Sequence, residues 1–264
     1  MTDIVQFIQK HGRVPMVERG DKPWMYRGWL GWITQTMHAY NDAGFPDRWG
    51  YLHAYKMTGK LPGPIPKVEY GAPSEEAVRN MAECVDIIWR SYAAWSGFSH
   101  LCEWLAYGLG VSRTNMPPEP SVLPQKTQEE LYRTFSLDLW LRAPHDYLGK
   151  FASEGKGRGK NWNPNAFYPT PHNVCECMVQ MQMADQIRDG EGDWAFKSVC
   201  DPCVGTGRML MHAGNHSLVL YGADIDGLMV LCSKINGAIF VPWMVCPVGM
   251  GGLAQEESLQ EQHV

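Results

Sequence analysis

The chain has 264 residues, of which 45% are hydrophobic, and a formal net charge of −5 at pH 7. This length and apolar content suffice for one large domain or two small ones. A negative net charge gives no molecule-wide attraction for nucleic acid, so any contact with DNA has to be local or come from a partner. No run of about eighteen apolar residues occurs, and charges interrupt the first residues. We therefore expect no membrane span, no secretory signal and a cytoplasmic location.

The eight cysteines contain no repeated CxxC pair. Cys200 and Cys203 form a single CxxC across the end of an expected strand, whose neighbours a different motif explains better. Cys175 and Cys177 lie two residues apart on an expected helix, which turns them to different faces. We expect buried free thiols, the usual state in a reducing compartment, and predict no metal site.

Residues 1–150 predict a mainly helical region of unassigned role. Residues 24–32 place bulky aromatics at helical spacing, which favours a core over a surface for stacking bases. Ser74 can cap a helix that continues through recurring apolar residues to about residue 108. Thr127 and Glu130 have the spacing of a capping box, which predicts a second helix over 127–142.

A change of composition over residues 149–165 separates this region from the remainder, 151–264. The segment is rich in glycine and in basic residues and reads as a mobile basic loop or a domain linker. Lys156, Arg158 and Lys160 are candidates for sequence-independent contacts with DNA phosphates. A solvated linker explains the same residues without any ligand, and that interpretation stays open.

Downstream of residue 165 the pattern alternates between helix and strand. Thr170 and Pro171 are suited to open a helix that Gly190 can close, and Asp226 is suited to cap a later one. The expected elements are a helix over 171–190, a strand ending at 201, a helix over 208–213, a strand over 217–224 and a helix over 226–235. This order predicts an α/β fold with a parallel unit, and hence a partial Rossmann-like sheet at the C-terminus.

The segment DPCVGTGRML is the sharpest feature of the sequence. Gly205 and Gly207 follow the first strand and would let the backbone approach a ligand closely. The next helix then presents unpaired N–H groups to an anionic group such as a ligand carboxylate, and Asp201 can accept a hydrogen bond from a ligand ammonium. The alternative is a tight strand-to-helix turn that binds nothing.

A second acidic position lies about twenty residues further on, the distance at which nucleotide-binding sheets place a ribose ligand. Asp224 ends the second expected strand, where a carboxylate can accept from both hydroxyls of an adenosyl ribose. An exposed carboxylate at a strand end, without a ligand, is the alternative.

Together with a third, upstream segment, these two resemble the DNA amino-methyltransferases, particularly the group that contains the methylation subunits of type I restriction–modification systems. The residues that carry the resemblance are Phe167, Tyr168, Thr170 and Pro171, then Asp201, Pro202, Gly205 and Gly207, then Asp224. The resemblance covers about residues 165–245. It implies that these residues form a binding site for S-adenosylmethionine as cofactor, with Thr170 and the glycine turn at its amino-acid end and Asp224 at its ribose. It also implies methyl transfer to the exocyclic amine of adenine in DNA.

The sequence departs from that family at the acceptor site. Family members that methylate adenine carry an Asn/Asp-Pro-Pro-aromatic segment, whose ring stacks on the flipped base. Residues 115–119, 163–166 and 241–243 each match it only in part. The residues after the glycine turn are also too few for the remaining strands and helices of a complete fold at usual element lengths.

Three functions follow as alternatives. The first is a DNA methyltransferase whose acceptor site is disguised or comes from a second subunit. The second is a catalytically inactive cofactor-binding or regulatory subunit of a DNA modification or restriction complex. The third is a methyltransferase for RNA, protein or a small molecule.

Overall fold

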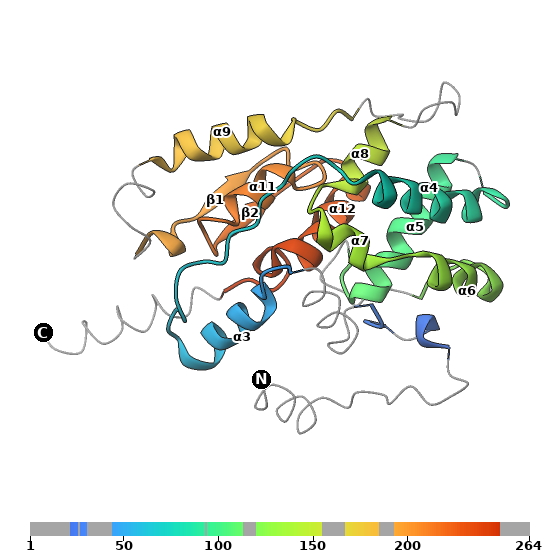
Figure 1. Cartoon of the computed structure of the whole chain (residues 1–264), viewed down its shortest axis with the longest axis horizontal. Coiled ribbons are helices and arrows are strands. Elements are labelled where there is room, and N and C mark those ends of the chain that lie inside the picture. The colour runs from blue at the N-terminus through green and yellow to red at the C-terminus, as the bar shows by residue number, and fades with distance from the viewer. Residues whose placement is uncertain are drawn as a thin grey trace, which may run out of the picture.

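The computed structural model describes residues 22–25, 27–30, 44–92, 94–112, 120–154, 167–184 and 193–248. These residues form a mainly helical protein with one small sheet (Figure 1). The elements, in chain order, are η1 (Pro23–Met25), α3 (Arg48–Thr58), α4 (Glu75–Trp89), α5 (Ala94–Leu109), α6 (Gln125–Thr134), α7 (Leu137–Arg142), α8 (Tyr147–Glu154), α9 (His172–Gln182), η2 (Asp193–Phe196), β1 (Val199–Asp201), α11 (Arg208–Ala213), β2 (Leu220–Gly222), α12 (Gly227–Phe240) and η3 (Pro242–Met244). Within the described ranges, no helix has both the length and the apolar character needed to cross a bilayer.

The expected α/β class with a partial Rossmann-like sheet is wrong. β1 and β2 pair in parallel, with Val199 opposite Leu220 and Asp201 opposite Gly222, and this two-stranded sheet is the whole of the sheet structure in the described residues. The first strand, both following helices and the parallel pairing lie where the sequence predicted them. A strand–turn–helix–strand pattern is local, however, and says nothing about whether further strands join the sheet. After β2 the apolar residues of α12 pack among helices instead.

Two expected helices of the first region are each divided in the structure. Ser74 caps α4 as predicted, accepting a hydrogen bond from the Ala77 amide at 3.4 Å. The helix stops at Trp89, and α5 packs back against α4, which lets both helices bury an apolar face. The capping box at Thr127 and Glu130 does not form, because α6 starts after Pro124 and Thr127 lies inside it. Extended backbone at Phe135 then separates α6 from α7.

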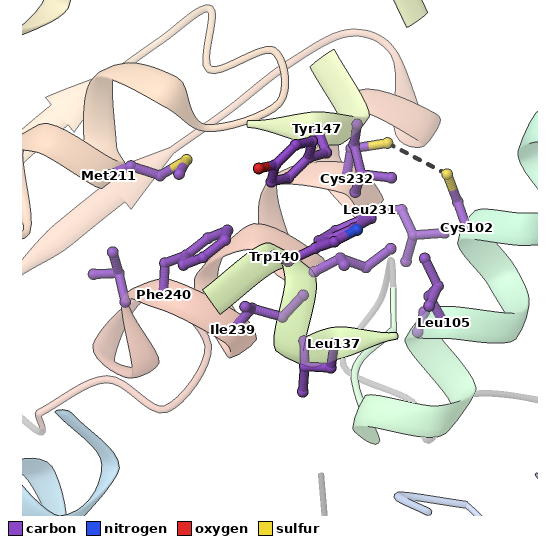
Figure 2. Close-up of a cluster of buried hydrophobic side chains, with 14 of the residues drawn as sticks. Cys102, Leu105, Leu137, Trp140, Tyr147, Met211, Leu231, Cys232, Ile239 and Phe240 are labelled. Atoms are coloured by element: carbon purple, nitrogen blue, oxygen red, sulfur yellow. Dashed lines mark hydrogen bonds between the residues drawn. The ribbon is translucent and has the colours of Figure 1, made fainter. Parts of the chain in front are cut away.

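The hydrophobic core joins the helices on both sides of the 149–165 segment. α12 lies in the middle of the molecule and packs on α5, and α8 contacts both α4 and α12 (Figure 1). Figure 2 shows Trp140 and Leu105 beside Leu231, with the sulfurs of Cys102 and Cys232 3.6 Å apart. One continuous cluster of buried side chains therefore spans both regions. The division into two domains stays a prediction about independent folding.

Arg48 of α3 fixes the extended segment that follows this helix. Arg48 is only 1% exposed, and its guanidinium donates to the carbonyl oxygens of Pro66 at 2.8 Å and Phe240 at 3.0 Å. Asn215 receives a further bond from Arg48 and pairs with the backbone of Val68 in both directions. These bonds hold residues 66–71 against the end of α11 and so determine where the next side chains of the segment lie.

Candidate functional site

The structure brings together the three segments that the sequence singled out. The Gly205 amide donates to Asp224 Oδ2 at 2.8 Å, so the glycine turn and the second strand end are in direct contact. The ring of Phe167 lies over the same glycine: a Cβ atom added to Gly205 would be 2.8 Å from Phe167 Cε2. The sequence placed these residues in one site but did not predict that they would contact one another.

The Phe-Tyr-Pro-Thr-Pro segment is attached to the first residue of α11. The carbonyl oxygen of Thr170 accepts a hydrogen bond from Arg208 Nη1 at 2.9 Å. The expectation that Thr170 caps the following helix is wrong, since α9 starts after Pro171 with no side-chain cap. Tyr168 is 78% exposed and projects beside this attachment. Gly190, the predicted end of the helix, lies outside the described residues.

The carboxylates at the strand ends already bind backbone amides. Asp201 accepts from the Cys203 amide at 3.0 Å, and Asp224 Oδ1 accepts from the Asp226 amide at 2.9 Å. Asp226 caps α12 as predicted, accepting from Leu228 at 2.8 Å. Each Asp224 oxygen keeps acceptor capacity beyond the one bond it receives. Asp224 is half-buried and Pro202 is exposed, so the carboxyl ends of the two strands are accessible to solvent.

The glycines of the turn are required by the packing of the protein itself. Gly205 and Gly207 have φ angles of 52° and 89°, a backbone region that other residues rarely adopt. A Cβ atom at Gly207 would lie 2.6 Å from Ser233 Oγ and 3.1 Å from Met244 Cε. Both glycines are buried. As arranged here, the turn does not accept the amino-acid end of S-adenosylmethionine at Gly205, whereas Asp224 is partly exposed and keeps acceptor capacity for hydroxyl donors.

A buried carboxylate beneath the turn was missed by the sequence reasoning. Asp146 has no exposed surface and accepts from Thr206 Oγ1 at 2.5 Å, from Arg208 Nε at 3.1 Å and from Asn236 Nδ2 at 2.8 Å. It also accepts from the Gly149 amide at 2.8 Å, one turn into α8. An aspartate just before a helix is a recognisable cap in sequence. The other partners come from distant segments and carry no local signal.

Two histidines extend this network away from the turn. The Asp146 amide can only donate, so His172 Nε2 accepts from it at 3.3 Å and His172 Nδ1 donates to His212 Nε2 at 2.9 Å. Burial, with a contribution from the nearby Arg208 cation, lowers the pKa of His172 to about 2 and that of His212 to about 4. Both rings are therefore neutral at pH 7, and Tyr70 packs against each of them.

Two pockets lie on either side of Tyr70. One, of about 830 Å³, lies between residues 67–71, α9 and the end of α11. The other, of about 620 Å³, lies between residues 70–73, α8 and residues 168–173, and is lined in part by Tyr168 and Arg208. Both volumes fall in the range of small-molecule sites. The second pocket directly adjoins the glycine turn through Arg208, the residue after Gly207.

The predicted DNA-phosphate contacts belong to the basic segment 149–165. Lys156, Arg158 and Lys160 lie outside the described residues. Among the residues that are described, no group of histidine, cysteine or acidic side chains is arranged to hold a metal ion.

No protein-family model, curated protein or solved structure matches the chain. The resemblance to DNA amino-methyltransferases therefore stays a prediction.

Proposed function

We propose that this chain binds S-adenosylmethionine at the carboxyl ends of β1 and β2, and that it belongs to a DNA adenine-modification system. The observation that carries the proposal is the meeting of Phe167, Gly205 and Asp224, which are widely separated in sequence. Strand ends joined by a glycine turn are the usual place for an adenosyl ligand in parallel α/β units. Methyl transfer to the adenine amine then requires an acceptor site, either within this chain or from a second subunit.

A second candidate function is favoured by the contacts of the turn. Phe167 covers Gly205, and the Gly205 amide and Asp224 satisfy each other. The polar and apolar groups of the turn thus have partners within the protein and need no ligand. This favours a subunit that keeps the local structure of a methyltransferase but does not bind the cofactor, and that regulates a modification or restriction complex. In the turn as arranged, the amino-acid end of the cofactor does not fit beside Gly205.

Calorimetric titration with S-adenosylmethionine separates the two candidates. Asp224→Asn removes the charge that would accept from the ribose hydroxyls, and we expect it to weaken binding about tenfold, the effect of one charged hydrogen bond. Asp226→Asn is the matched control, because asparagine caps a helix as well as aspartate does. Heat with the wild-type chain that is reduced only in Asp224→Asn supports the cofactor site. A wild-type chain without heat or thermal shift supports the regulatory candidate.

A further inference from the structure

His145, which lines the pocket beside Tyr168, keeps one hydrogen-bond acceptor that no described residue uses. His145 is 8% exposed and lines the pocket. Its Nδ1 lies 2.9 Å from the carbonyl oxygen of Gly71, which can only accept, so Nδ1 carries the proton. Burial is the main factor that lowers the pKa of His145, so the ring is neutral at pH 7. Nε2 is then an unprotonated acceptor, and it has no partner among the described residues.

The other walls of the pocket match a flat heterocycle. Tyr168, 78% exposed, stands at the rim, and Pro73, Pro169 and Pro171 contribute rigid apolar surface. The positive charge of Arg208 is already neutralised by Asp146 and its Nη1 is bonded to Thr170, so Arg208 acts here as a wall. Lys150 bonds to Glu154 at 2.7 Å and keeps two further N–H donors. The pocket thus offers stacking surface, the His145 acceptor and, at its edge, the Lys150–Glu154 ion pair.

We propose that this pocket binds an amine-bearing nucleobase, with the exocyclic amine donating to His145 Nε2, the ring face against Tyr168 and an attached phosphate toward Lys150. The pocket would then bind adenine within this chain, in place of the Asn/Asp-Pro-Pro-aromatic segment that the sequence lacks. The proposal rests on the proposed function for the choice of adenine over cytosine. The binding itself depends only on the pocket.

The amine contact is tested by comparing two ligands in the absence of S-adenosylmethionine. AMP and purine riboside 5′-monophosphate differ only in the exocyclic amine. We expect the wild-type chain to bind AMP five- to tenfold more tightly, the effect of one buried hydrogen bond. In His145→Phe, which keeps a ring but has no acceptor, the two affinities should become equal. Equal affinities in the wild type, or no binding of AMP, would overturn the proposal.

Two exposed tyrosines provide a test that does not depend on how His145→Phe folds. Tyr168→Ala should weaken AMP binding about tenfold through lost stacking. Tyr221→Ala, which removes a tyrosine 49% exposed on β2 and outside the pocket, should leave AMP binding unchanged. If Tyr168→Ala binds AMP as the wild type does, the base is not in this pocket.

Two further arms identify the source of the base and separate this proposal from the cofactor site. A single-stranded oligodeoxyadenylate that binds more tightly than AMP, with the same sensitivity to Tyr168→Ala, assigns the pocket to a DNA strand; tighter binding of AMP assigns it to a free nucleotide. Asp224→Asn should weaken S-adenosylmethionine binding and leave AMP binding unaffected, and His145→Phe should weaken AMP binding and leave S-adenosylmethionine binding unaffected. Loss of both ligands in both variants would overturn the assignment of two sites.

Discussion

The helical core and the glycine turn hold their backbones in place by different physical means. Around α5, α7 and α12 the interior consists of apolar side chains such as Trp104 and Trp140, both fully buried. Around the glycine turn the interior is polar, and Asp146 collects donors from the turn, α11, α12 and α8. Apolar packing is non-directional and tolerates exchange of similar volumes, whereas a buried charge network fails when one member is removed.

Removal of Asp146 should give the largest loss of stability. Asp146→Ala leaves Arg208 buried without its carboxylate, and we expect a loss of about 3–5 kcal/mol in the free energy of unfolding. Asp138→Ala is the matched control: its bond to Arg142, 2.7 Å long, lies at the surface and should contribute no more than about 0.5 kcal/mol. Urea denaturation measures both. Equal midpoints for the two variants would contradict the polar network as the support of the turn.

Two glycines with similar φ angles test how tightly the turn is packed. Gly59, at the end of α3, has a φ of 68° and open space around it. Gly59→Ala should therefore lower the free energy of unfolding by only about 1 kcal/mol, the cost of a positive φ for alanine. Gly207→Ala adds the overlap with Ser233, for a total of about 3 kcal/mol. Thermal unfolding of the two variants gives the difference. If the two losses are equal, the packing around Gly207 is loose enough to accept a methyl group.

The histidine pair predicts a smaller, pH-dependent difference. The pKa values of His172 and His212 are lowered on folding, so the unfolded chain takes up protons first as the pH falls below 6.5. Stability should therefore decrease from pH 6.5 toward about pH 4, by about 1 kcal/mol for each histidine by about pH 6. The double variant with His172→Gln and His212→Gln should lose less stability than the wild type over this pH interval. Parallel curves for wild type and variant would show that the pair does not titrate with folding.

Local signals predicted the strand–turn–helix–strand segment well. Asp201 ends β1, α11 runs from Arg208 to Ala213, and Asp226 caps α12, because caps and glycine turns depend on a few adjacent residues. The same signals failed where tertiary contacts decide. Thr127 lies inside a helix that Pro124 starts earlier, and the long helix from Ser74 is divided so that α4 and α5 can pack together.

Local sequence signals located both strands to within a few residues and identified the glycines of the turn and the acidic residues that follow the strands, although β2 is shorter than the predicted 217–224. Tertiary contacts account for the absence of a third strand in the described residues, for the position of Phe167 over Gly205 and for the support that Asp146, just before α8, gives to the turn. The two kinds of feature differ in sequence separation, because turn geometry and helix capping depend on residues within a few positions of one another. Burial of a charge or addition of a strand depends on segments that meet only in the folded molecule.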